Sequence, residues 1–168
     1  MKLGIDLGGT KIEGVILSDS GVVLDRKRVA TPAKSYSQII KSIANLIGTL
    51  CQSDPTLLDL PVGIGIPGSL SNVSGLVKNA NTTTLIGKAL DKDLQANLCR
   101  PIKVANDADC FTISEAVDGA GKGYKVVLGV ILGTGVGGGI TFEKKLWSGP
   151  NAISGEWGHN PMPFFSVG

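Results

Sequence analysis

The sequence predicts an α/β fold in which three antiparallel strands come first and helices then alternate with strands. Residues 1–17 alternate apolar with other residues on both sides of a Gly-Gly-Thr break, a pattern typical of a β-hairpin. Residues 39–50 carry apolar side chains at the spacing of one helix face. The strand, glycine turn and strand of the opening recur near residue 128, which predicts the start of a second, similar lobe.

The other elements follow from turn signals and apolar spacing. A third strand is expected over 22–29, after a turn at 19–21, and it completes an antiparallel meander. The later segments are expected to be a strand over 60–66, a helix over 91–98, a strand over 102–105 and a helix over 108–117.

Composition and charge limit the class of protein. The 168 residues are 42% hydrophobic and 18% charged, which is typical of a folded chain and excludes a disordered one. A net charge of +2 provides no basic field for nucleic acid, so we expect no such partner. No apolar run reaches the roughly 18 residues of a spanning helix, and no cleavable leader precedes the first strand. We therefore expect a cytoplasmic protein without a membrane partner.

The glycine turn of the opening hairpin carries groups that suit a phosphate. Gly8 and Gly9 offer backbone amides, and we expect them at positive φ in a tight primed turn. Thr10 and Lys11 add a hydroxyl and an ammonium group that can face an anion, and Asp6 can hold the accompanying cation. A plain hairpin without a ligand is the alternative.

Two later strands end in polar residues that are candidates for ligand contacts. Gly68 and Ser69 follow the first of these strands, and Asn106 and Asp107 end the second. In α/β sheets such carboxyl ends line the ligand crevice. A carboxylate at position 107, within reach of a substrate hydroxyl, would act as a general base, although it could instead cap the next helix.

Three further polar residues are candidates for sugar contacts. Asn79 lies in the segment NANTTT, whose amides and hydroxyls suit a polyol but also suit ordinary turns. Glu156 and His159 are three residues apart, so they share a face in a helix or converge in a turn. His159 is the only histidine, and by itself it makes no metal site.

The second lobe begins with a copy of the opening hairpin. Shifted by 125 residues and without a gap, residues 3–8 lie over 128–133 and residues 14–17 over 139–142, which we interpret as the same pattern in register. Ile131 replaces Asp6, and the turn reads Gly133-Thr134-Gly135 with no following lysine. We infer that only the first lobe handles a metal ion. The second lobe would bind another part of the same phosphate chain through backbone amides and the Thr134 hydroxyl.

The repeat also predicts the domain organisation. A first lobe over 1–118 leaves only 119–168 for the second, which we expect to be incomplete. We therefore expect the chain to be the first part of a longer protein.

Several motifs, in this order and spacing, resemble the N-terminal half of sugar kinases of the ROK family (repressors, open reading frames, kinases). The resemblance implies an actin-like ATPase fold, with two ribonuclease-H-like lobes that close on ATP and a sugar. It also implies Mg²⁺ and the phosphorylation of a hexose at its 6-hydroxyl. The resemblance runs from Lys2 to about Pro163 and is carried by IDLGGTK, IPGS, VKNANTT, ANDAD, ILGTGVGGG and GEWGHNP.

The resemblance also implies roles for individual residues. Asp107 would be the catalytic base, and Asp6 would hold Mg²⁺ through water. The residues implied around ATP are Asp6, Gly8, Gly9, Thr10 and Lys11 in the first loop and Gly133, Thr134, Gly135, Gly137, Gly138 and Gly139 in the second. Those implied around the sugar are Gly68, Asn79, Asn106, Glu156 and His159, with Ser69 as the further candidate named above.

Members of the family usually bind zinc through the histidine of the GxxGH segment and three cysteines further along. His159 is present but the chain ends before such a cluster, and Cys51, Cys99 and Cys110 cannot replace it by position. Zinc is therefore expected only in a full-length protein, and this chain by itself is expected to be inactive.

The resemblance leaves the sugar and the assembly less defined. GEWGHNPMP and VKNAN most resemble bacterial fructokinases, with a glucokinase, mannokinase or N-acetylglucosamine kinase as alternatives. A non-catalytic sugar-binding protein is the other alternative. A repressor would need a DNA-binding domain ahead of the first strand, for which we expect no room. We expect a homodimer when the protein is full length.

Overall fold

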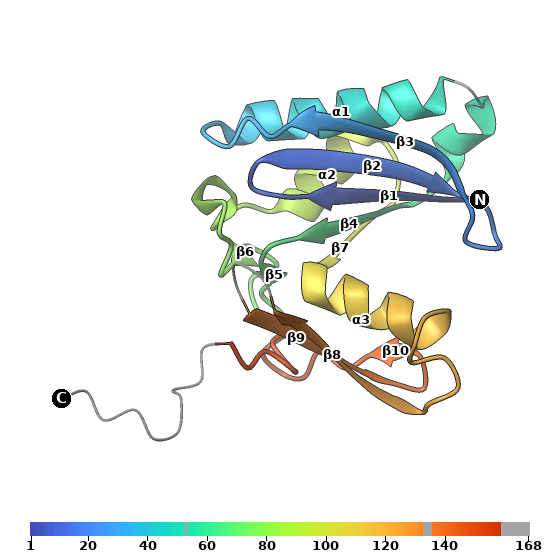
Figure 1. Ribbon diagram of the computed structural model, residues 1–168. Coiled ribbons are helices and arrows are strands. Elements are labelled where there is room, and N and C mark those ends of the chain that lie inside the picture. The colour runs from blue at the N-terminus through green and yellow to red at the C-terminus, as the bar shows by residue number, and fades with distance from the viewer. Residues whose placement is uncertain (53, 133–135, 159–168) are drawn as a thin grey trace. The chain divides into compact units, whose positions relative to one another are not determined.

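The computed structural model of the chain describes residues 1–52, 54–132 and 136–158 (Figure 1). It consists of two compact units, Met1–Asp107 and Ala108–Gly168, and each is described by itself. Among the described residues, no helix is long and apolar enough to cross a membrane.

The first unit is built on a mixed five-stranded sheet, as the sequence predicts. Its first three strands form the expected antiparallel meander, and the last two run parallel to the first. The order across the sheet is β3-β2-β1-β4-β7. The strands are β1 (Lys2–Leu7), β2 (Lys11–Leu17), β3 (Val23–Ala30), β4 (Val62–Ile66) and β7 (Ile102–Asn106).

Two α-helices and several short elements complete this unit. Helix α1 (Tyr36–Cys51) packs on β2 and β3, and helix α2 (Leu90–Leu98) packs on β7 and on α1. The short elements are the 3-10 helices η1 (Pro55–Asp59) and η2 (Thr83–Leu85) and the paired strands β5 (Ser69–Leu70) and β6 (Val77–Lys78).

The core of the first unit confirms the apolar spacing seen in the sequence. Ser35 begins α1 as its N-cap, and its side chain accepts a hydrogen bond of 3.4 Å from the Gln38 amide. The helix lies close to β2 at Gly14, where an added Cβ would meet Leu50 Cδ1 at 2.6 Å. All six apolar residues that predict the helix are buried: Ile39, Ile40, Ile43, Leu46, Ile47 and Leu50.

The second unit contains helix α3 (Asp107–Val117), whose first residue still belongs to the first unit, and a three-stranded antiparallel sheet. Gly129 and Gly139 allow α3 to lie against this sheet, because a Cβ at either position would overlap Thr112 Oγ1. This packing explains why the units divide at Asp107 and not after residue 118, where the sequence analysis puts the boundary. The strands are β8 (Val126–Leu132), β9 (Val136–Phe142) and β10 (Lys145–Leu146), in the order β10-β9-β8.

The repeated hairpin has the predicted strands but a different register. Adding 125 to the bounds of β1 and β2 reproduces those of β8 and β9 to within one residue. Leu7 pairs with Ile12, however, whereas Leu132 pairs with Val136, one residue earlier than the repeat predicts. The strand bounds therefore confirm the ungapped recurrence of strand, turn and strand, whereas the pairing register of the two hairpins differs by one residue.

This slip of one residue turns every side chain of β8 to the opposite face. In the first hairpin Leu3, Ile5 and Leu7 are buried. Their counterparts in β8 are exposed, at 60% for Leu128, 41% for Val130 and 72% for Leu132.

Candidate functional site

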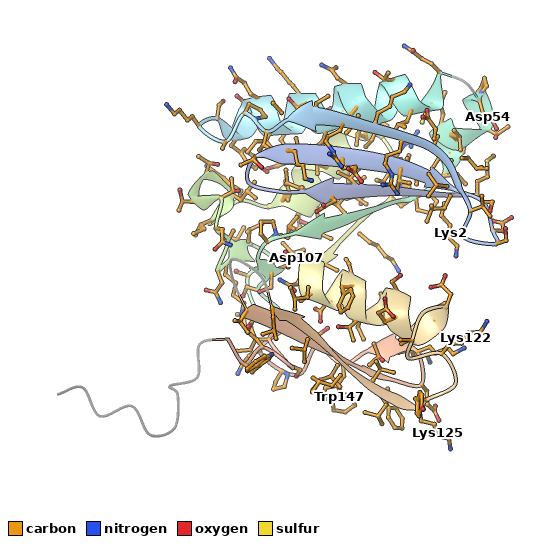
Figure 2. All side chains as sticks on the ribbon, in the orientation of Figure 1. Lys2, Asp54, Asp107, Lys122, Lys125 and Trp147 are labelled. Carbon is orange, nitrogen blue, oxygen red and sulfur yellow. The ribbon has the colours of Figure 1, made fainter. Side chains whose placement is uncertain are left out.

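The candidate residues of the first unit gather at the carboxyl ends of β1, β4 and β7. Asp6 of β1 pairs with Gly65 of β4, and Gly65 pairs with Ala105 of β7, so β4 is the only strand between β1 and β7. At the usual spacing of strands, the ends of β1 and β7 are about 10 Å apart. Asp107 follows β7 as the first residue of α3, at the position labelled in Figure 2.

Asp6 and Asp107 influence each other electrostatically. The pKa of Asp6 is raised above its ordinary value, first by partial burial and next by the negative charge of Asp107. Lys11 and Arg28 act in the opposite direction and lower this pKa. Two carboxylates that repel each other at a strand edge provide a place where a cation is favoured.

The turn between β1 and β2 is tied down by hydrogen bonds to its own chain and to Thr31. The Gly8 amide donates to the Lys11 carbonyl at 2.9 Å, and the Thr31 hydroxyl donates to the Gly8 carbonyl at 2.8 Å. The Thr31 amide in turn donates to the Thr10 carbonyl at 3.0 Å. The residues left at the exposed tip are Gly9, Thr10 and Lys11.

The conformation of this turn corrects one prediction. Neither Gly8 nor Gly9 has positive φ, so the turn is not of the primed type. Glycine relieves crowding at position 8, because a Cβ there would lie only 3.0 Å from the Lys11 carbonyl oxygen. The turn is therefore tight because the backbone at Gly8 lies close to the Lys11 carbonyl, and not because its glycines adopt left-handed backbone torsions.

Two threonines beside the turn were not recognised from the sequence. Thr31 secures the turn, as described above. The hydroxyl of Thr82 faces Gly9, 3.7 Å from the point where a Cβ would be, and it is buried with no hydrogen-bond partner. Thr82 belongs to the NANTTT segment, whose polar composition could have indicated that this threonine lies near a site. No local pattern in the sequence distinguishes Thr31.

The predicted sugar residues of the first unit come together around Gly68. The Asn106 side-chain amide donates a hydrogen bond of 3.1 Å to the Gly68 carbonyl, which joins the loop after β4 to the end of β7. An added Cβ on Gly68 would lie 2.9 Å from Ala80, so the segment that holds Asn79 is packed against the same loop. Ser69 pairs with Lys78 in the β5–β6 ladder.

Asn79 has a left-handed backbone, with φ of 54°. Asparagine tolerates this conformation better than most residues, so the position agrees with turn chemistry. Its side chain is exposed beside the Gly68 loop.

The second unit holds the remaining candidates. Gly137, Gly138 and Gly139 lie within β9 and not in a loop, and a Cβ on Gly138 would overlap the Gly155 carbonyl oxygen. Packing alone is therefore sufficient reason for glycine at positions 138 and 139, whereas a Cβ on Gly137 would make only an ordinary contact, 3.4 Å from the Ala108 Cβ. Glu156 is exposed, and its carboxylate accepts a hydrogen bond of 3.2 Å from the Gly158 amide. Gly133, Thr134, Gly135 and His159 lie outside the described residues.

The described residues fit one of the two expected metal ions. Mg²⁺ uses one or two carboxylates together with water and phosphate oxygens, and the exposed carboxylate of Asp6 can be one of them. Within the described ranges, no group of three or more His, Cys, Asp or Glu side chains is placed to hold a metal. The three cysteines lie in separate places, Cys51 in α1, Cys99 after α2 and Cys110 in α3, and they offer no zinc site.

Fold and site together define an α/β lobe of the actin-like ATPase class, with polar loops at the carboxyl ends of its central strands. The sequence comparison identifies the family. Residues 2–167 match the ROK family, and the chain belongs to it.

The curated relatives include N-acetyl-D-glucosamine kinases. That of Photobacterium profundum is 41% identical over 172 residues, which cover 100% of this chain and 56% of the relative. That of Vibrio cholerae is 41% identical over 164 residues, 97% of this chain and 53% of the relative. The chain thus spans about half the length of the curated relatives it matches. These names agree with the sugar kinase class and do not support a fructokinase in particular.

Solved structures agree with this family. The Streptomyces griseus glucokinase in complex with glucose and AMPPNP has a TM-score of 0.82 and 31% identity, covering 94% of this chain and 49% of its own. The inorganic polyphosphate/ATP-glucomannokinase of Arthrobacter sp. strain KM has a TM-score of 0.77 and 36% identity, covering 92% of this chain and 62% of its own.

Proposed function

We propose that this chain provides the sugar-binding and catalytic lobe of an ATP-dependent sugar kinase that phosphorylates a hexose-type sugar at its 6-hydroxyl. The observation that carries the proposal is the arrangement at the strand ends. There, Asp107 acts electrostatically on Asp6, and Asn106 bonds to the Gly68 loop. Membership of the ROK family and the named kinase relatives support the same activity.

In this proposal Asp107 accepts the proton of the attacking sugar hydroxyl. It is exposed at the start of α3, so a substrate can reach it. Asn106 orients the Gly68 loop, while Asn79 and the loop itself bind other hydroxyls of the sugar. In the second unit, Glu156 and His159 are proposed to complete the sugar site. As general base, Asp107 increases the nucleophilicity of the hydroxyl as it attacks the γ-phosphate.

The phosphate chain of ATP is proposed to lie on the two glycine turns. The exposed amides of Gly9 and Thr10 and the Lys11 ammonium face the phosphates in the first unit. In the second unit, residues 133–139 would bind another part of the phosphate chain of ATP. Asp6 would hold Mg²⁺ through water, and the ion would neutralise charge on the phosphate oxygens.

We propose N-acetyl-D-glucosamine as the preferred acceptor because the relatives from Photobacterium profundum and Vibrio cholerae carry that name at 41% identity. Fructose, the acceptor predicted from the GEWGHNPMP motif, is tested beside it, as are glucose and mannose. The proposal also includes a homodimer, zinc binding through His159 with further cysteines, and a cytoplasmic location, all for the full-length polypeptide.

A coupled ADP-release assay on the full-length polypeptide that carries this chain tests the proposal. We expect ATP turnover that depends on sugar, with kcat/KM highest for N-acetyl-D-glucosamine. A higher kcat/KM for fructose would favour the fructokinase. Sugar binding in titration calorimetry with no turnover for any of the four sugars would contradict the kinase and favour a non-catalytic sugar-binding protein.

A further inference from the structure

A surface pocket of about 450 Å³ lies at the end of the first unit's sheet that is remote from the candidate site. Every charged residue that lines it is positive. Five of its lining residues are exposed, and Arg100 is the buried one, with 6% of its surface accessible. The lining residues are Lys92, Gln95, Ala96, Cys99, Arg100 and Pro101.

Arg100 lacks a partner for part of its guanidinium group. Its Nη1 atom is buried and makes no hydrogen bond. A buried guanidinium nitrogen without an acceptor is unfavourable, because the group has left water and gained no compensating contact. A phosphate oxyanion that enters the pocket would supply that acceptor once the guanidinium group turns towards it, and arginine suits phosphate through two parallel N–H groups.

The backbone on both sides of Arg100 is held in place. Before it, Cys99 ends α2 in a left-handed conformation with φ of 52°, and its amide donates to the Gln95 carbonyl at 2.9 Å. After it, the Pro101 carbonyl accepts a hydrogen bond of 3.0 Å from the Val62 amide of β4. Binding at a fixed site requires little further ordering of the chain.

One face of α2 provides the rest of the pocket. Lys92, Gln95, Ala96 and Cys99 are spaced at intervals of three and four residues, as one helix face requires. The helix also carries two acidic residues that do not line the pocket: Asp93 accepts a hydrogen bond from the Tyr36 hydroxyl, and Asp91 has a buried carboxylate oxygen with no hydrogen-bond partner among the described residues. Lys92 and Gln95 can therefore contact an anion and the hydroxyl groups attached to it.

We propose that this pocket binds a phosphate oxyanion, as inorganic phosphate or as the phosphate group of a sugar monophosphate. Arg100 contacts the phosphate oxygens and Lys92 adds a second positive charge. The volume is more than a free phosphate fills, which leaves room for a sugar ring. Strand β7 separates the pocket from Asp107 by about 17 Å, so this site is distinct from the one proposed for ATP. The proposal does not depend on kinase activity.

Titration of the isotopically labelled 168-residue chain with inorganic phosphate, observed by NMR, tests the proposal. We expect saturable shifts of the amides of residues 92–101 with a dissociation constant in the millimolar range. Parallel titrations with glucose 6-phosphate and with glucose distinguish the two sources of phosphate and the neutral sugar. Because Cys99 is exposed in the pocket, phosphate should also slow its alkylation by iodoacetamide relative to Cys110.

Substitutions separate a binding role of Arg100 from a structural one. Lys92→Glu changes an exposed residue, so it should fold normally and weaken phosphate binding about tenfold or more. Arg100→Lys keeps the charge near the carboxyl end of α2 but loses the paired N–H groups, and it should weaken binding to a similar extent. Lys41→Glu makes the same charge change on exposed α1 and should leave binding unchanged.

The proposal is overturned if the wild-type chain shows no saturable shifts, or if Lys92→Glu and Lys41→Glu weaken binding equally. It is also overturned if Arg100→Lys lowers the thermal midpoint while phosphate binding stays as in the wild type. That last result would leave Arg100 with a structural role only.

Discussion

Partial burial raises the pKa of Asp6, and the negative charge of Asp107, on the other side of strand β4, raises this pKa further. The folded chain therefore binds a proton at Asp6 more readily than the unfolded chain, whose Asp6 has the ordinary pKa of 3.8. Since the folded pKa is the higher one, stability falls as the pH rises from about 3.8 through the folded pKa. Above that window the ionised carboxylate is a constant destabilising contribution.

Asp6→Asn should remove this contribution. We expect the free energy of unfolding at pH 7 to rise by about 0.5 kcal/mol, a small value because the side chain is only partly buried and water still screens its charge. Urea unfolding between pH 3.5 and 7 measures it. In parallel, Asp107→Asn should lower the pKa of Asp6 in an NMR titration of its carboxyl carbon; an unchanged pKa would contradict the coupling between the two residues.

Asp107→Asn is also the direct test of the proposed general base. In the full-length polypeptide we expect kcat to fall about 10²- to 10⁴-fold while the dissociation constant for the sugar changes little. An amide cannot accept the hydroxyl proton but still occupies the same space. Asp109→Asn, two residues further along α3, is the matched control, and near-normal turnover of Asp107→Asn would refute the assignment.

Gly129→Ala should destabilise the second unit by about 1–3 kcal/mol, because the new Cβ would overlap Thr112 Oγ1. Thr112→Ala in the same chain should recover part of this loss, which a double-mutant cycle detects. Gly63→Ala is the control, since a Cβ on this other strand glycine meets nothing within 4 Å. Equal losses for Gly129→Ala and Gly63→Ala would show that α3 does not pack on β8 as described.

The register difference between the hairpins predicts opposite effects at two equivalent positions. Leu3→Lys places a charge where only 3% of the side chain is exposed and should destabilise the first unit by more than about 3 kcal/mol. Leu128→Lys changes a residue that is 60% exposed and should alter stability by less than about 0.5 kcal/mol. Thermal unfolding measures both, and similar losses would mean that the two hairpins share a register after all.

Local patterns predicted most of the fold. The six apolar residues of α1 identified a buried helix face because a period near 3.6 leaves little choice of which side is covered. The hairpin of β1 and β2 and the strands β4 and β7 were predicted to within a few residues for similar reasons.

Long-range relations were harder to predict. The ungapped repeat located β8 and β9, yet the side on which Leu128 lies depends on a pairing register that no local pattern encodes. Asn106 and Gly68 were each candidates from the sequence, whereas their hydrogen bond follows from the pairing of β4 with β7. The burial of Arg100 could not be predicted, because no local pattern marks this residue.

The open face of β8 has a practical consequence for handling the chain. The strand lies at the edge of its three-stranded sheet, and its exposed side chains are Val126, Leu128, Val130 and Leu132. An apolar strand that is unpaired along one edge is a template for the addition of another strand. Self-association at β8 should therefore grow with protein concentration, and a lysine at position 128 would act as a gatekeeper against it.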